Sequence, residues 1–243
     1  MLLEFSVSNF LSFNERTTLN MIPSIQSKTN TIESNGVRVL KFAAIYGANA
    51  SGKSNLIKAF MLMKRIVSSG MDLRFKNSYC RIKEENKKKN TSFSVTFYVN
   101  EKFYNFYFEV NMFNASVVQE YLSEINPKTD EITKLYAYKR GEKAFSKVFY
   151  DAKIDEFDQN RLITYLYDQT KENKHLLITT LMNKEWENNQ LAFINDFRQW
   201  MNRLDVNLVD KPIVSMQYLE DEKGRKKVSR ILKELNTGVV DID

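Results

Sequence analysis

The chain has 243 residues, of which 43% are apolar, so it can bury one large hydrophobic core or two small ones. Its single cysteine, Cys80, excludes an intrachain disulfide and indicates a reducing, cytoplasmic location. No run of about 18 apolar residues occurs, which excludes a membrane-spanning helix. The net charge of +6 is compatible with nucleic-acid binding but is also common in proteins that bind none.

The first segment of the chain predicts two short strands that lead to a longer one. Residues 1–8 alternate apolar and polar side chains at period two, which predicts a strand and not a signal peptide. Residues 9–14 favour a turn and residues 17–21 a second strand, followed by a polar loop over residues 23–36. Residues 37–46 are mostly apolar, so we expect a largely buried strand there.

A glycine-containing motif follows this predicted strand and precedes a predicted helix over residues 54–68. The eight residues from Gly47 to Ser54 match the phosphate-loop pattern G-x-x-x-x-G-K-[ST]. Strand, glycine loop and helix in this order form the context that the motif requires. The sequence therefore predicts a phosphate-binding loop at the start of the helix.

The residue types of this motif fit a nucleoside triphosphate, here ATP, with Mg²⁺. The two glycines let backbone N–H groups turn toward a phosphate, and the helix directs the positive end of its dipole to the same place. Lys53 can reach the β and γ phosphates as the catalytic cation, and the Ser54 hydroxyl can ligate Mg²⁺. The candidate nucleotide-binding residues are Gly47, Ala48, Asn49, Ala50, Ser51, Gly52, Lys53, Ser54 and Asn55.

The middle of the chain predicts an antiparallel β meander after a lysine-rich segment. Residues 81–90 are polar and rich in lysine, which favours a solvated loop, with a phosphate or DNA contact as the alternative. Four alternating segments follow, and we expect their aromatic side chains to pack on the core and not to stack on bases. These segments are residues 91–99, 104–110, 116–125 and 132–140.

From about residue 155 the apolar spacing becomes that of helices, which predicts a mostly α subdomain. Helices are expected around residues 162–166, 176–181, 191–204 and 221–235. His175, the only histidine, is interpreted as a surface or packing residue. The predicted organisation is a lobe of N-terminal strands and phosphate loop (1–80), a β meander (81–150), a helical subdomain (151–235) and the start of a further core strand (236–243).

The first 70 residues carry a family resemblance. A starting strand, the sequence Asn-Phe-x-Ser-Phe from Asn9 to Phe13, and a Walker A loop ending in Asn55-Leu56 resemble ABC-type ATPases of the structural-maintenance-of-chromosomes and RecF kind. Among these, the chain looks similar to bacterial AAA15/AAA21-type ATP-binding proteins, which are related to the overcoming-lysogenization-defect (OLD) family and to abortive-infection proteins. The resemblance extends to residues 118–122, 138–140 and 235–238.

The resemblance implies an α/β fold, the P-loop NTPase head of an ABC-type ATPase, with a β meander and a helical subdomain. It implies that two heads dimerise on ATP, and that they act in anti-phage defence (abortive infection) or DNA repair beside a nuclease or toxin partner or DNA. By the same analogy, Phe10 or Phe13 lies near the nucleotide base, with a plain core role as the alternative. Gln119 or Glu120 is a candidate for sensing metal and γ-phosphate, the alternative for Gln119 being a role on the sheet face.

The chain departs from this family pattern in two respects. It has no recognisable Walker B acid followed by a glutamate: residues 206–210 are followed by Lys211 and Pro212, and Val239-Val240-Asp241 lacks a following acid. It has no Leu-Ser-x-Gly signature either. We therefore expect the N-terminal part of a longer ATPase, or a natural truncation, which binds nucleotide better than it hydrolyses it.

The sequence is also compatible with two other functions. One is a non-hydrolysing interaction module in which the nucleotide stabilises the fold. The other is a direct nucleic-acid binder that uses the lysine-rich loop and the basic run Arg225-Lys226-Lys227. No paired carboxylates, zinc cluster or nucleophile–base pair in the sequence favours a nuclease or protease.

Overall fold

The computed structural model describes residues 1–24, 29–140, 174–183, 186, 191–207 and 222–234. The chain forms two compact units, Met1–Asp205 and Val206–Asp243. The described part of the second unit is chiefly helix α7 (Glu222–Glu234), where a helix was predicted over residues 221–235. Among the described residues, no helix is both long enough and apolar enough to cross a membrane.

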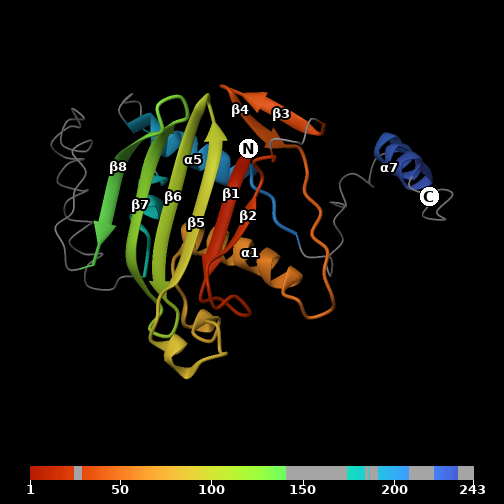
Figure 1. The fold of residues 1–243 in the computed structure, drawn as a ribbon. Helices are drawn as coiled ribbons and strands as arrows, with labels where there is room; N and C mark the ends of the chain where they lie inside the picture. Colours follow the sequence, from red (N-terminus) through yellow and green to blue (C-terminus); the bar gives the residue numbers. More distant parts are fainter. Residues whose placement is uncertain (25–28, 141–173, 184–185, 187–190, 208–221, 235–243) are drawn as a thin grey trace. The chain divides into compact units, whose positions relative to one another are not determined.

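A six-stranded antiparallel sheet forms the centre of the first unit (Figure 1). The predicted meander is confirmed, because four consecutive strands pair as neighbours in the sheet. The sheet order is β2-β1-β5-β6-β7-β8, so the predicted boundary at residue 80 falls between two strands, β1 and β5, that pair directly. The strands are β1 (Leu2–Ser8), β2 (Thr17–Asn20), β5 (Thr91–Val99), β6 (Lys102–Asn111), β7 (Ser116–Asn126) and β8 (Glu131–Lys139).

One face of this sheet carries the hydrophobic core. The strand register places Phe5 beside Val95, Val95 beside Phe106, and Phe106 beside Leu122, so period-two alternation brings these side chains to one face. All four are buried. The aromatic alternation in the sequence is thus a packed sheet face, as predicted.

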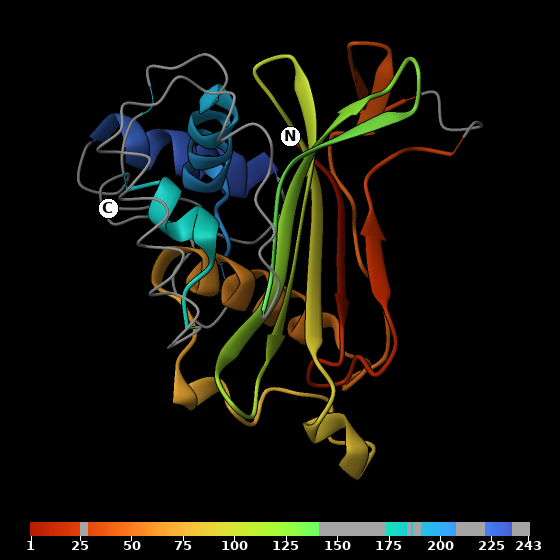
Figure 2. The same ribbon diagram turned by 90° about the vertical axis from the view of Figure 1, so that its left-hand side faces the viewer.

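Helices cover that apolar face (Figure 2). Helix α1 (Lys53–Ser69) packs through Phe60, whose ring centroid lies 3.7 Å from that of Phe5. Helices α4 (Leu177–Leu181) and α5 (Ala192–Arg203) continue the layer, and both lie where the sequence predicts helices. Two short 3₁₀ turns, η1 (Leu73–Phe75) and η2 (Glu84–Lys87), lie in the connection between α1 and β5.

The segment before the phosphate-loop motif differs from the sequence prediction. Strand β4 (Val37–Leu40) ends six residues before Tyr46 and pairs only with β3 (Thr31–Ser34), so the predicted long strand over residues 37–46 is wrong beyond Leu40. The predicted polar loop over residues 23–36 is wrong where it contains β3. Phe42 and Tyr46 are 63% and 89% exposed. Apolar composition alone does not make a strand, because a strand needs a neighbour for its backbone groups.

Three expectations cannot be compared with the structure. The helix expected around residues 162–166, the further strand over residues 236–243 and most of the segment 206–210 lie outside the described residues. His175, which is described, is exposed and lies beside Gly70, where a Cβ would be 2.5 Å from its Nδ1.

Candidate nucleotide-binding loop

The loop from Gly47 to Gly52 connects an exposed segment without regular secondary structure to the first residue of α1. Gly52 has φ 95°, in the left-handed region that glycine adopts without a steric penalty. A Cβ at Gly52 would lie 2.8 Å from Ser12 Oγ, and one at Gly47 would lie 2.7 Å from Ser51 Oγ. The positive φ gives Gly52 a conformational reason to be glycine, whereas the contact at Gly47 is with a hydroxyl that can rotate away.

The Lys53 side chain folds back onto the loop. Its Nζ donates hydrogen bonds to the carbonyl oxygens of Gly47 and Ala48, each at 2.7 Å. These neutral acceptors hold the ammonium group at the loop, where phosphate oxygens would be stronger, charge-assisted acceptors. The structure thus places the Lys53 ammonium at the loop, and its contact with phosphate stays a prediction.

The N-terminus of α1 is favourable for an anion. No side chain caps the helix, and its first turn contains no acidic residue that would neutralise the positive end of the dipole. Ser54 is exposed in this first turn, so its hydroxyl is accessible to a metal ion. In the part of the chain that the structure describes, no group of three or more His, Cys, Asp or Glu side chains forms a metal site. Ser54 stays the Mg²⁺ ligand that the sequence motif predicts.

The turn between β1 and β2 packs against the start of α1. Asn55 Nδ2 donates to Ser12 Oγ at 2.9 Å, and a Cβ at Gly52 would lie 3.5 Å from the Phe13 ring. Phe10, by contrast, is only 2% exposed and its ring centroid lies 6.1 Å from that of Phe93. Of the two phenylalanines considered for base contact, the structure places Phe13 at the loop and Phe10 in the core.

A family model described as an AAA domain, putative AbiEii toxin, type IV toxin–antitoxin system, matches residues 42–223, more than half of the chain. The chain belongs to this AAA-domain family. The match confirms the AAA21-type resemblance inferred from the sequence and indicates a nucleotide-binding, ATPase-like domain. It begins just before the loop and includes α1, the β meander and the described helices of the first unit. The comparison with curated proteins gave no match.

Gln119, the second candidate metal-sensing residue, lies elsewhere in the AAA domain. It occupies β7, where it pairs with Glu109 and Lys139, and two strands separate β7 from β1. Its neighbour Glu120 is buried on the face that the helices cover, so alternation directs Gln119 to the opposite face. The structure does not bring Gln119 beside Ser54.

Glu120 supports the fold at the start of α4. Its carboxylate accepts hydrogen bonds from the backbone N–H of Leu177, from that of Ile178 at 3.4 Å, and from the Tyr136 hydroxyl at 3.1 Å. Burial raises the pKa of Glu120 to about 7, although these hydrogen bonds act in the opposite direction. Sequence reasoning missed this contact. The available clue was that Glu120 lies two residues before Leu122 in the same strand, so both side chains point to the same, buried face of the sheet.

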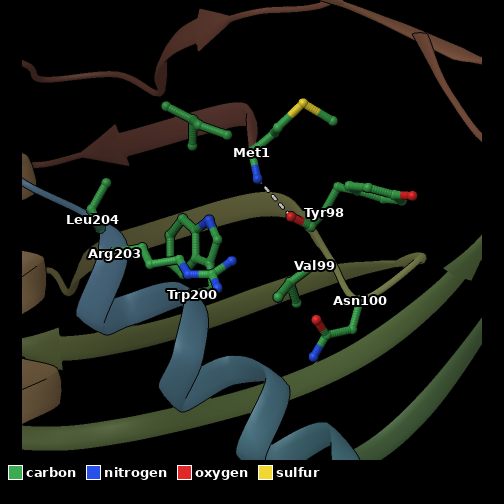
Figure 3. A pocket seen from close by; sticks show the side chains of 8 residues that line it. Met1, Tyr98, Val99, Asn100, Trp200, Arg203 and Leu204 are labelled. Atoms are coloured by element: carbon green, nitrogen blue, oxygen red, sulfur yellow. Dashed lines mark hydrogen bonds between the residues drawn. The ribbon is translucent and has the colours of Figure 1, made fainter. Parts of the chain in front are cut away.

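A pocket of about 410 Å³ lies at the opposite end of β1 from the loop (Figure 3). The Met1 amino group donates to the Tyr98 carbonyl at 2.6 Å there, and burial together with the nearby Arg203 lowers its pKa. Because β1 separates this pocket from the turn that contacts Gly52, the pocket takes no part in the candidate nucleotide site. Its lining residues are Met1, Leu2, Tyr98, Val99, Asn100, Trp200, Arg203 and Leu204.

Proposed function

We propose that this AAA domain is the ATP-binding head of an ABC-type ATPase with the P-loop fold. The observation that carries the proposal is the position of the Lys53 ammonium, 2.7 Å from two carbonyl oxygens of a loop with glycine at both ends. That loop opens directly into the uncapped N-terminus of α1. A polyphosphate placed there gains backbone N–H donors, a helix dipole and one cation.

Each candidate residue has a distinct task in this proposal. The backbone N–H groups from Ala48 to Lys53 bind the phosphates, and Lys53 exchanges its carbonyl acceptors for β- and γ-phosphate oxygens. Ser54 holds Mg²⁺, which neutralises charge between those phosphates. Phe13 lies beside Gly52 and offers a ring surface close to the bound nucleotide.

The biological role in this proposal is control of a partner. ATP binding, hydrolysis and dimerisation of two heads regulate an effector such as a nuclease or toxin, or a DNA transaction, in the cytoplasm. The family description, which names a putative AbiEii toxin and a type IV toxin–antitoxin system, supports anti-phage defence as the setting, with DNA repair as the other.

Nucleotide binding by Lys53→Ala tests the proposal. Titration of a fluorescent ATP analogue with Mg²⁺ is expected to give an affinity at least about tenfold weaker in this variant, because a charge-assisted contact to two phosphates is lost. Lys58→Ala is the matched control, since Lys58 is an exposed lysine of the same helix. Equal affinity in wild type and Lys53→Ala would remove the basis of the proposal.

Hydrolysis separates a working ATPase head from a nucleotide-dependent interaction module. We expect single-turnover ATP hydrolysis to be slow in this chain and faster when a second protein or domain contributes the acidic residues that Mg²⁺ and the attacking water need. A nucleotide that raises the melting temperature but is never hydrolysed under any of these conditions favours the interaction module.

A further inference from the structure

We propose that the segment from Asp72 to Lys89, called the basic loop, binds the phosphate backbone of single-stranded nucleic acid together with Phe113. This surface is separate from the nucleotide loop and does not depend on the function proposed for it. The proposal follows from the charge balance of the basic loop, its rigid attachment and the apolar side chains between its cations.

The basic loop has a large local excess of positive charge. It contains seven basic and three acidic side chains, in a chain whose whole net charge is +6. Two of the acids are paired inside the loop, Asp72 with Arg74 at 2.7 Å and Glu85 with Lys89 at 2.7 Å. Within the loop itself, Glu84 is the one acid outside these two ion pairs, against five exposed cations, which are Lys76, Arg81, Lys83, Lys87 and Lys88.

Two buried asparagines fix the backbone of the basic loop. Asn9 Nδ2 donates to the carbonyl oxygens of Asn86 at 3.0 Å and Lys89 at 3.1 Å, and its Oδ1 accepts from Cys80 N at 3.2 Å. Asn86 Nδ2 donates in turn to Asn14 Oδ1 at 2.7 Å. Because the loop is already ordered, a ligand that binds its cations loses less conformational entropy.

Apolar side chains lie among these cations. Lys87 Nζ lies 3.9 Å from the centre of the Phe113 ring, which is 39% exposed. Ile82 and Leu73 are 70% and 65% exposed. A single-stranded nucleic acid offers both partners that this surface needs, since its phosphates are regularly charged and its unpaired bases have flat apolar faces. A duplex hides those faces in its stack, so the surface fits the single strand better.

The first experiment measures affinity as a function of salt. A fluorescent single-stranded oligonucleotide of about 20 nucleotides is titrated with the full chain by anisotropy between about 50 and about 200 mM KCl. The variant Lys83→Gln/Lys87→Gln/Lys88→Gln is expected to bind at least about tenfold more weakly and to reduce the salt slope by about 2 to 3. Lys58→Ala, which removes one exposed lysine of α1, is expected to bind the oligonucleotide as the wild type does.

The matched control removes the same charge at the other end of the sheet. Lys102, Lys128 and Lys134 are exposed residues at or near the β5–β6 and β7–β8 turns, so Lys102→Gln/Lys128→Gln/Lys134→Gln changes net charge equally. We expect it to weaken binding by less than about twofold. An equal loss in both triple variants would overturn the proposal, because it would mean that only overall charge matters.

The second experiment identifies the ligand class. Phe113→Ala keeps every charge and is expected to weaken single-strand binding by about tenfold while changing duplex binding much less. Poly-glutamate and phosphatidylserine vesicles serve as competitors. If either displaces the oligonucleotide at an equal concentration of negative charge, the surface recognises an acidic protein or a membrane and the nucleic-acid proposal is wrong.

Discussion

Replacing Glu120 by glutamine is expected to change how the stability of the first unit depends on pH. Glu120 is 1% exposed, and burial raises its pKa from 4.5 to about 7. Between these two values the folded chain keeps a proton that the unfolded chain has released, so stability falls as pH rises. A shift of this size corresponds to about 3 kcal/mol of unfolding free energy, lost between about pH 4.5 and about pH 7.

Glutamine cannot ionise, and its side-chain oxygen can still accept a hydrogen bond from the N–H of Leu177. Urea unfolding of wild type and Glu120→Gln at about pH 4.5 and about pH 7.5 gives four free energies. The unfolding free energy of Glu120→Gln minus that of the wild type should rise by about 3 kcal/mol from the lower to the higher pH. Glu131→Gln, in which an exposed carboxylate at the start of β8 is replaced, is the control and should follow the wild type.

Both proteins contain the same other titratable groups, so the contributions of those groups to the pH dependence of stability cancel in this difference. A change below about 1 kcal/mol would refute the reasoning, because it would mean that the carboxylate remains well solvated or fully compensated as an ion. A change of opposite sign would mean that the hydrogen bonds from α4 outweigh the effect of burial.

Three further substitutions test the packing of the first unit. Gly52→Ala should destabilise the chain by about 1–2 kcal/mol in urea unfolding, because alanine is strained at φ 95° and its Cβ would lie 2.8 Å from Ser12 Oγ; an unchanged midpoint would contradict this geometry. Asn9→Ala removes the buried amide that fixes the basic loop and should cost about 3 kcal/mol, together with faster hydrogen exchange in that loop. Trp200→Ala should cost about 3–5 kcal/mol, because the ring is 5% exposed and stacks 4.3 Å from Phe97; a loss below about 1 kcal/mol would place it outside the core.

The elements that could be predicted from the sequence are those whose pattern is local. Alternation over residues 91–99 and 104–110 predicts paired strands, and the broad apolar surface of residues 54–68 predicts a well-packed helix. Both predictions match the structure, in β5, β6 and α1. The motif Gly47 to Ser54 is local in the same sense, and the structure brings Lys53 Nζ to the carbonyl oxygens of Gly47 and Ala48 within one loop, while its nucleotide-binding role stays a prediction.

Features that depend on distant partners could not be predicted in this way. The apolar run over residues 37–46 indicates burial but does not name a neighbour, and the structure pairs only its first part, with β3. Gln119 and Glu120 are adjacent, so an error of one residue in register would exchange their faces. The contact of Glu120 with Leu177 joins residues 57 positions apart, which no local pattern reports.

The turn between β1 and β2 joins the two proposed binding surfaces physically. Asn9 and Leu11 adopt left-handed conformations, with φ 49° and 46°, so the chain reverses within a few residues. This reversal places the Asn9 side chain in the basic loop while Ser12 accepts a hydrogen bond from Asn55 in the first turn of α1. Asparagine adopts this region more readily than most residues, and the buried hydrogen bonds of its amide hold Asn9 there. Any coupling that a ligand at one surface exerts on the other through this turn must act by the same factor in both directions.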